Sequence, residues 1–305
     1  METYNRKLGH LAASFCIIVW STTYVSTKIL LEDFTPTEIL VFRFIIAYIL
    51  LFILSPKPMI PDSKKEELIF IAAGFSGVLI YFLFQNIGLT YTLASNAGVL
   101  VSVAPMFTAI ISHFMKDGQK LSRPFVIGFI IAIIGISFIS FNGSFILKLN
   151  PIGDILLLIA ALSWAVFSNL LTLVNNGKYT IVQSTRKVFF YGLIFMIPTS
   201  LLMDFEFTLT RFIEPFKLTK LLSSNIFNIL FLGLLASGIC FVTWNYAVKT
   251  LGSVKTSTYI YLSPIVTIIF SVITLGEPIT WASISGTALI LIGLTISERK
   301  RNDMD

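Results

Sequence analysis

The chain contains ten apolar stretches, and their lengths approach the roughly 20 residues that a helix needs to cross a bilayer. The expected spans are 8–31, 36–55, 68–90, 93–115, 122–141, 152–174, 184–203, 226–247, 254–275 and 280–297. Only 12% of the 305 residues are charged and the mean hydropathy is +0.86, whereas soluble domains carry roughly 25% charged residues. The sequence therefore excludes a soluble enzyme and predicts an all-α integral membrane protein.

The second half of the chain repeats the first. A shift of 159 residues places Asn86 on Asn245 and Pro105 on Pro264, and a shift of 158 residues places Gly135 on Gly293. A unit of five spans crosses the membrane an odd number of times, so its second copy must be inverted. We expect ten transmembrane helices as two inverted five-helix repeats, residues 1–146 and 151–300, with a substrate site between them.

Basic residues are divided unequally between the two ends of the expected spans. Counting Lys and Arg gives 16 on the side of the N-terminus and 6 on the other side. The positive-inside rule then predicts both termini in the cytoplasm and a multi-pass protein of the plasma (cell inner) membrane. The same rule accounts for the net charge of +6 without nucleic acid as a partner. A short amphipathic helix is expected in the longest connection, around Leu209–Leu222.

Two prolines, Pro105 and Pro264, fall inside the fourth and ninth spans. A proline inside a helix kinks it and frees the carbonyl four residues earlier, here those of Val101 and Ile260. Such a carbonyl needs a partner in lipid. We interpret the pair as helix kinks that face a cavity, with packing kinks satisfied by neighbouring helices as the alternative.

Two tryptophans, Trp20 and Trp164, lie near the middle of their spans, where anchoring at the headgroups cannot explain them. Large rings beside small polar groups suit an organic ligand with a flat or apolar side, and ordinary core packing is the alternative. The candidate cavity residues are Trp20, Tyr24, Tyr81, Gln85, Ser102, Trp164, Ser168, Trp244, Asn245, Tyr259 and Ser263.

Polar pairs end the third and eighth spans at matching positions. Gln85–Asn86 and Trp244–Asn245 are interpreted either as parts of two gates or as groups that cap helix ends. Arg43 and Arg186 are assigned to regions near span ends, and Glu38 to the positive N-terminus of a helix. The absence of a carboxylate near mid-membrane favours facilitated diffusion or exchange over proton coupling.

Metal and cofactor chemistry has little support in the sequence. The histidines His10 and His113 are 103 positions apart near span ends, where solvation is the simpler interpretation, and Cys16 and Cys240 lie inside apolar spans. No metal site and no cofactor are expected. The expected partners are the lipid bilayer and a small-molecule substrate, and the choice between a monomer and a homodimer is left open.

Two segments resemble the EamA-type family of the drug/metabolite transporter superfamily. They are GDILLLIAALSWAVFS (Gly153–Ser168) and LSPIVTIIFSVITLGEPITWASISGTALILIG (Leu262–Gly293), with support from Val19–Phe44. The resemblance covers residues 10–297 and implies ten helices in two inverted repeats, a central cavity, and export of amino acids or other small metabolites. Gln119 stands where the family usually has a glutamate like Glu277.

These observations predict a transporter that exports small metabolites, amino acids first, by alternating access. The alternative is a membrane sensor or partner-binding protein without transport, although such proteins usually carry a soluble signalling domain. A membrane enzyme would need a cluster of His, Asp, Glu or Ser side chains at a membrane face, and the sequence shows none.

Overall fold

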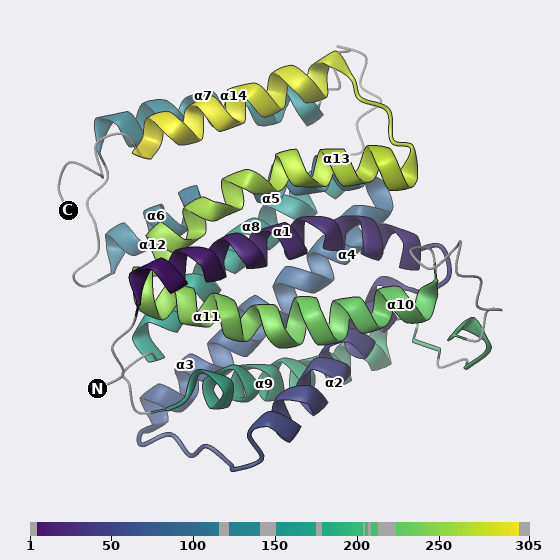
Figure 1. The fold of residues 1–305 in the computed structure, drawn as a ribbon, viewed down its shortest axis with the longest axis vertical. Helices are drawn as coiled ribbons and strands as arrows, with labels where there is room; N and C mark the ends of the chain where they lie inside the picture. Colours follow the sequence, from purple (N-terminus) through teal and green to yellow (C-terminus); the bar gives the residue numbers. More distant parts are fainter. Residues whose placement is uncertain are drawn as a thin grey trace.

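The computed structural model describes residues 5–115, 122–140, 151–174, 179–203, 205–206, 209–212 and 224–298, and within these ranges every regular element is helical (Figure 1). The first half holds α1 (Arg6–Leu30), α2 (Pro36–Leu54), α3 (Lys64–Gly74), η1 (Phe75–Ile80), α4 (Tyr81–Tyr91), α5 (Ala94–Val101), α6 (Ala104–Phe114) and α7 (Arg123–Ser140). The second half holds α8 (Pro151–Val174), α9 (Ile181–Leu202), η2 (Leu209–Phe212), α10 (Asn225–Leu230), η4 (Phe231–Ile239), α11 (Cys240–Leu251), α12 (Ser253–Ser257), η5 (Thr258–Leu262), α13 (Ser263–Leu275) and α14 (Trp281–Glu298).

Every expected span coincides with a helix or a continuous series of helices, within a few residues at each end. Among the described residues, seven of these helices or helix series are long and apolar enough to cross a membrane. The other three are α7 and α14, which have 18 residues each, and α9, which carries Gln183, Arg186 and Lys187 in its first turns. The all-helical membrane fold is therefore as predicted. For the amphipathic helix expected around Leu209–Leu222, the structure describes the single turn η2, and residues 213–223 lie outside the described ranges.

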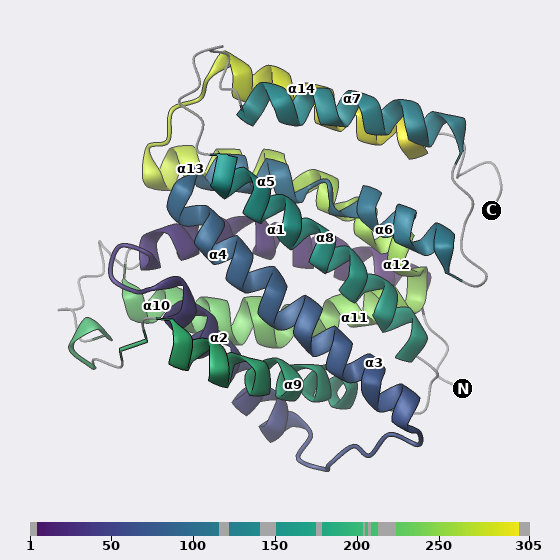
Figure 2. The same ribbon diagram turned by 180° about the vertical axis from the view of Figure 1, so that it is seen from behind.

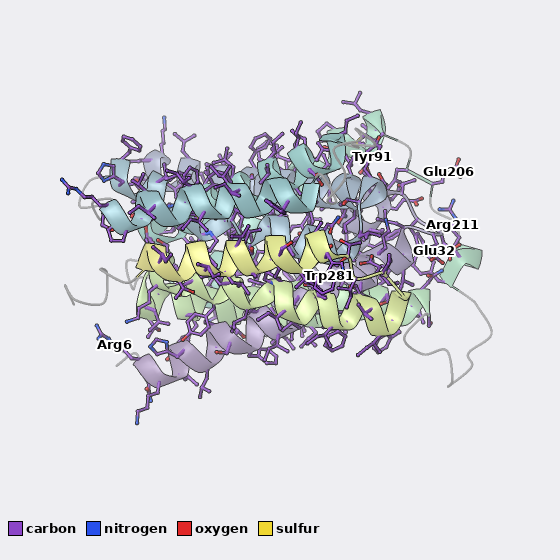
Figure 3. All side chains as sticks on the ribbon, turned by 90° about the horizontal axis from the view of Figure 1, so that it is seen from above. Arg6, Glu32, Tyr91, Glu206, Arg211 and Trp281 are labelled. Atoms are coloured by element: carbon purple, nitrogen blue, oxygen red, sulfur yellow. The ribbon has the colours of Figure 1, made fainter. Side chains whose placement is uncertain are left out.

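The helices form a bundle of layers. In the view of Figure 1, α7 and α14 lie side by side along one edge, α5 and α13 follow, and α1, α4 and α8 cross the centre. Figure 2 shows α2 and α9 at the opposite edge, with α3 beside them. The start of α1 and the end of α14 lie at the same end of the bundle (Figure 1). Figure 3 places Arg6 at that end and Glu32, Glu206 and Arg211 at the other.

Capping motifs begin the second helix of each half. At α2, the Thr35 hydroxyl accepts from the Glu38 amide and the Glu38 carboxylate accepts from the Thr35 amide at 2.7 Å. At α9, Thr180 and Gln183 form the same reciprocal pair. These contacts satisfy amides that no helical carbonyl can reach. They also confirm the structural role expected for Glu38, which additionally forms an ion pair with Arg211 at 3.1 Å.

The third and eighth spans each contain a π-helical segment, η1 and η4. A π segment changes the backbone register, so that some of its carbonyls become available to side chains of other helices. The Trp20 indole donates to the Ala236 carbonyl in η4 at 2.7 Å. In the other half, the Ser163 hydroxyl donates to the Ser76 carbonyl in η1 at 2.8 Å. Each π segment thus fixes the helix that carries a central tryptophan.

The fourth and ninth spans are interrupted before their prolines rather than at them. Pro105 and Pro264 are the second residues of α6 and α13, where a missing amide breaks no helical bond. The interruption itself is a turn at Ser102–Val103 in one span and the 3₁₀ segment η5 in the other. At each expected kink, one helix therefore ends and another begins, up to one turn before the proline in the chain.

Candidate functional site

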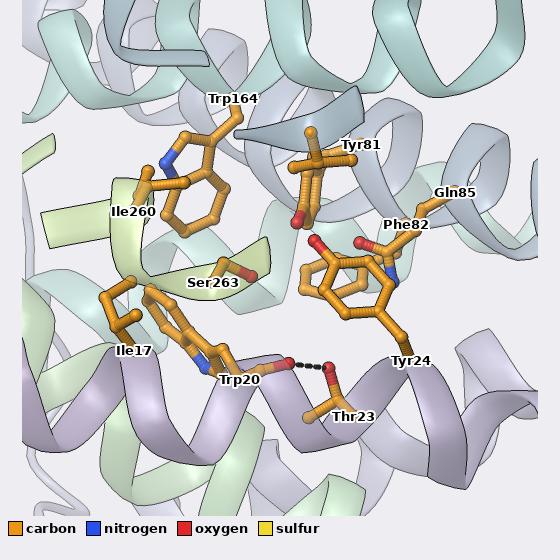
Figure 4. A pocket seen from close by; sticks show the side chains of 11 residues that line it. Ile17, Trp20, Thr23, Tyr24, Tyr81, Phe82, Gln85, Trp164, Ile260 and Ser263 are labelled. Carbon is orange, nitrogen blue, oxygen red and sulfur yellow. Dashed lines mark hydrogen bonds between the residues drawn. The ribbon is translucent and has the colours of Figure 1, made fainter. Parts of the chain in front are cut away.

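A pocket lies at the centre of the bundle, where helices from both halves of the chain meet (Figure 4). Its walls come from α1, α4, α5, α8, η5 and α13. The lining residues are Ile17, Trp20, Thr23, Tyr24, Tyr81, Phe82, Gln85, Val101, Trp164, Ile260 and Ser263. Five of the eleven residues are aromatic, and none of these described lining residues is charged.

The pocket is nearly closed in this conformation. Its cavity volume is only about 30 Å³. It corresponds to about two water molecules. An organic molecule therefore requires side chains of the lining to move.

Six of the predicted cavity residues meet at this pocket: Trp20, Tyr24, Tyr81, Gln85, Trp164 and Ser263. Figure 4 shows the hydroxyl groups of Tyr24 and Tyr81 facing one another across it. The rings of Trp20 and Trp164 meet edge to face at 5.2 Å. Trp20 is anchored through its indole nitrogen, whereas the Trp164 indole nitrogen and the Gln85 amide nitrogen have no hydrogen-bond partner among the described residues.

A residue at each of the two helix interruptions reaches the same pocket. Val101 and Ile260, the residues whose carbonyls the prolines were expected to release, both line it. Val101 is the last residue of α5 and Ile260 lies within η5. The two broken helices therefore each place a residue at or next to the break in the lining of one central pocket.

Three predicted residues lie away from the pocket and have other partners. The Ser102 hydroxyl donates to the Val99 carbonyl at 2.6 Å, and the Asn245 amide donates to the Thr185 hydroxyl in α9 at 2.8 Å. The Tyr259 hydroxyl lies 2.5 Å from Nδ1 of His10. His10 is thus half-buried and bonded between helices, not a freely solvated residue as expected.

Trp244 and Ser168 are also outside the lining, although both are fully buried. The Trp244 ring packs 5.0 Å from Trp20 and 6.1 Å from Trp164, so it supports the pocket wall from behind. In the described part of the chain, neither its indole nitrogen nor the Ser168 hydroxyl has a hydrogen-bond partner. The eighth span was expected to line the cavity, but its residue Trp244 packs behind the lining residues instead.

The polar pairs at the ends of the third and eighth spans connect helices. The Asn86 amide donates to the Pro36 carbonyl at the start of α2 at 3.1 Å, whereas the Asn245 amide donates to the Thr185 hydroxyl, in the second turn of α9. The Asn86 bond fits the interpretation in which the amides serve helix ends, the Asn245 bond joins two helices through side chains, and Gln85 lines the pocket.

Sequence reasoning misplaced Arg43. The side chain was assigned to a region near a span end, but Arg43 is the eighth residue of the nineteen in α2 and is only 1% exposed. Its Nε donates to the Ser237 hydroxyl in η4 at 2.9 Å, and its guanidinium lies 4.2 Å from the centre of the Phe82 ring. Phe82 itself lines the pocket and had no distinguishing feature in the sequence.

Polar contacts close the bundle at both ends of the pocket. At one end the Glu277 carboxylate accepts from the amides of Ala94 and Ser95, at 2.7 and 3.0 Å, and from the Ser95 hydroxyl at 2.6 Å. Glu277 therefore caps the N-terminus of α5 from the far side of the chain. At the other end, the His10–Tyr259 contact joins α1 to η5. Gln119, which stands in the place of a second such glutamate, lies outside the described residues.

Residues able to hold a metal ion do not gather in the described ranges, where no group of three His, Cys, Asp or Glu side chains is found. The free thiols of Cys16 and Cys240 are buried, and the Cys16 thiol donates to the Cys240 carbonyl at 3.2 Å. The chemistry available at the described lining is stacking and hydrogen bonding, and the Arg43 guanidinium lies behind Phe82.

Comparison with known proteins gives a consistent result. The sequence profile described as the EamA-like transporter family matches residues 7–141 and 151–298. An uncharacterized transporter of Archaeoglobus fulgidus is 26% identical over 96% of this chain and 98% of its own length. The uncharacterized transporter YdfC of Bacillus subtilis is 26% identical over the whole chain and 94% of its own length. A crystal structure with 18% sequence identity shares the fold over 95% of this chain, with a TM-score of 0.65.

Proposed function

The chain belongs to the EamA-like transporter family, and we propose that it carries a small organic metabolite across the membrane by alternating access, with the central pocket as its substrate site. One observation carries the proposal: side chains from both family matches, with Trp20 and Trp164 at equivalent positions, converge on a single pocket. Sites between two repeats near the bilayer centre are typical of transporters built from inverted halves.

Paired features support the division into two inverted five-helix halves. The capping pairs at Thr35 and Thr180 begin the second helix of each half, and π segments interrupt the third. Broken helices precede Pro105 and Pro264 in the fourth. Because irregular backbone within a membrane persists only where it lines a cavity or packs against protein, its repetition in both halves supports a shared central site.

The two closed ends suggest where the gates lie. Opening on the side of Glu277 requires its carboxylate to leave the amides of Ala94 and Ser95, whereas opening on the other side requires His10 and Tyr259 to separate. Breaking one set while keeping the other exposes the pocket to one side at a time. By the distribution of basic residues, the His10 gate faces the cytoplasm and the Glu277 gate faces outward.

The aromatic lining supports a substrate with an apolar or flat portion, and aromatic faces also attract an ammonium group. Amino acids combine both properties, and we propose them as the first class to test, with export as the direction. The described lining holds no carboxylate, which supports facilitated diffusion or exchange rather than proton coupling.

Uptake into liposomes with the purified protein tests this function. A panel of labelled amino acids is measured with and without a pH gradient and with unlabelled substrate inside the vesicles. Transport accelerated by internal substrate but not by the gradient is expected. Protein that binds members of the panel without moving them would instead indicate a sensor or partner-binding protein.

Two tryptophan variants assign the transport to the pocket. Trp164→Phe keeps an aromatic ring but removes an indole donor from the lining, and uptake is expected to fall about five- to tenfold. Trp281→Phe alters a ring that is 85% exposed at the start of α14 and should leave uptake unchanged. Equal effects of the two substitutions would place the substrate elsewhere.

A further inference from the structure

Arg43 is a buried cation in the middle of a membrane-spanning helix. Its side chain is 1% exposed, between the packed helices of α2, α4 and η4. A guanidinium stays charged at physiological pH, and burying such a charge without compensation carries a large free-energy penalty. A membrane protein retains a residue of this kind where it serves a pathway or a ligand.

The hydrogen-bond partners of Arg43 account for one of its donors. Nε donates to Ser237, but neither Nη1 nor Nη2 has an acceptor among the residues that the structure describes. The described ion pairs join Lys187 to Glu67 and Arg211 to Glu38 and Glu206, so Arg43 faces no carboxylate within these ranges. The outer edge of the guanidinium, which presents its N–H groups in parallel, is therefore unused.

A single side chain is shared by Arg43 and the pocket. The guanidinium lies 4.2 Å from the centre of the Phe82 ring, and Phe82 forms part of the pocket lining. Tyr81, which precedes Phe82 in α4, also forms part of the lining. Since the closed pocket admits only about two water molecules, some ring must move before a substrate enters. Movement of Phe82 would bring the free N–H groups of Arg43 into contact with the substrate.

The free hydrogen-bonding groups around the pocket are mainly donors. The Gln85 amide nitrogen and the Trp164 indole nitrogen belong to the lining and, like Nη1 and Nη2 of Arg43, lack partners in the described ranges. Donors of this kind favour a ligand that supplies acceptors, as an anion does. One guanidinium matches the single charge and paired oxygens of a carboxylate, whereas a phosphate dianion calls for further cations, and the described lining contains no Lys or Arg.

We propose that Arg43 binds the carboxylate of the transported molecule and that Phe82 covers this site until substrate enters. The assignment rests on the proposed transport function and narrows its substrate to organic carboxylates, amino acids among them. The carboxylate takes both terminal nitrogens of the guanidinium, and the rest of the molecule lies among Trp20, Tyr24 and Trp164. Ser237 acts as a positioning residue, because its hydroxyl fixes Nε and thereby the direction of the fork.

Binding of matched acids and amides tests the proposal directly. Purified protein in lipid nanodiscs, with Trp281→Phe as background, is titrated with 3-phenylpropanoate, 3-phenylpropanamide, L-phenylalanine and L-phenylalaninamide, and tryptophan fluorescence is recorded. Three tryptophans then remain, all at or behind the pocket. Each acid is expected to bind about 10- to 100-fold more tightly than its amide, the range expected for a charge-assisted hydrogen bond.

Variants of Arg43 and a matched arginine separate recognition from folding. Arg43→Gln should reduce the acid-to-amide ratio to near one, Arg43→Lys should restore part of it, and Arg186→Gln should leave it unchanged. If the Arg43 variants do not give monodisperse protein, Phe82→Leu serves instead. A smaller cover exposes the guanidinium, so the ratio should rise above that of the parent protein. A ratio that stays constant in Phe82→Leu contradicts the role of Phe82 as a cover.

The outcomes distinguish this proposal from the transport function. Transport of a panel compound without preference for acids overturns the role of Arg43 and leaves transport intact. Acid-selective binding that depends on Arg43, without any transport, supports the carboxylate site and removes the transport function. Parent protein that binds no acid of the panel overturns the carboxylate site.

Discussion

Arg43 and Arg186 stand at corresponding places in the two halves, 23 residues after Trp20 and 22 after Trp164, yet their surroundings differ. Arg186 is the sixth residue of α9 and donates to the carbonyls of Ser55 and Lys57, in the chain just beyond α2. Arg43 lies deeper in its helix and has one side-chain acceptor.

The position of each arginine along its helix explains why the two guanidinium groups differ in their hydrogen-bond partners. The last carbonyls of a helix and the loop beyond it lack helical partners, so a nearby arginine finds acceptors there and stabilises the helix C-terminus. In mid-helix, the carbonyls of the neighbours are already bonded within their own helices, and a guanidinium depends on the few hydroxyl groups within reach. Arg186 is thus a structural clamp, because its guanidinium ties α9 to the chain beyond α2. At Arg43 the terminal nitrogens of the guanidinium lack acceptors among the described residues.

Replacing the satisfied arginine should give the largest change in stability. Arg186→Met removes the charge-assisted bonds to Ser55 and Lys57, and the free energy of unfolding is expected to fall by about 1.5–3 kcal/mol. Unfolding by SDS in mixed micelles measures it. The adjacent Lys187→Met is the control, because its ion pair with Glu67 is partly exposed and is worth less than about 1 kcal/mol. Equal losses in both variants would argue against a clamp.

The unsatisfied arginine should respond with the opposite sign. Arg43→Met keeps most of the side-chain volume and removes a buried charge, so the protein is expected to gain about 1 kcal/mol in stability in the same assay, even though it loses the bond to Ser237. A loss of stability comparable to that of Arg186→Met would mean that Arg43 is as well satisfied as Arg186, and the comparison would fail.

Removing the acceptor that Arg43 has among the described residues should have an effect of similar size but opposite sign. Ser237→Ala leaves the guanidinium without its hydroxyl partner and is expected to lower stability by about 1 kcal/mol in the parent protein. The same substitution in an Arg43→Met background should be nearly neutral. This double-mutant cycle measures the coupling of the two side chains, and additive effects would show that they are independent.

The smallest predicted effect concerns the rings beside the two cations. Phe82 lies 4.2 Å from the Arg43 guanidinium, whereas Phe52 lies 5.7 Å from that of Arg186 and is half exposed. Cycles of Phe→Leu with Arg→Met are expected to give a coupling of about 0.5–1 kcal/mol for Arg43 and less for Arg186. The reverse order would show that Arg186 depends on its ring as well as on its carbonyl partners.

Hydropathy predicted the helices closely, because roughly 20 apolar residues have few alternatives to a membrane helix. The mid-span position of Trp20 and Trp164 also led to the pocket, since such rings have no interface to anchor. The depth of Arg43 was missed because charges were judged by their distance from an estimated span end. An error of a few residues there moves a side chain by a full turn of helix.

Other features of the pocket leave no signal in a single sequence. Phe82 and Ile17 are two apolar residues among many, and only the packing of α1 against α4 brings them to the lining. Tyr259 shares a polar helix face with Ser263, yet the interruption at η5 sends its hydroxyl to His10. A periodic face predicts which residues are neighbours on one helix, but the partner helix decides which of them meets the cavity.

The α7–α14 pair has a consequence for how the two halves move. A Cβ atom at Gly135 would lie 2.6 Å from the Gly286 carbonyl oxygen, and one at Gly293 would lie 2.4 Å from that of Gly128, so the two backbones touch. Because α7 belongs to the first half and α14 to the second, this contact joins the halves at one edge of the fold (Figure 1). Backbones this close can swivel about their contact more readily than they can slide or part. If the halves rock during transport, their rotation axis passes near these glycines, and displacement grows with distance from that edge toward α2 and α9.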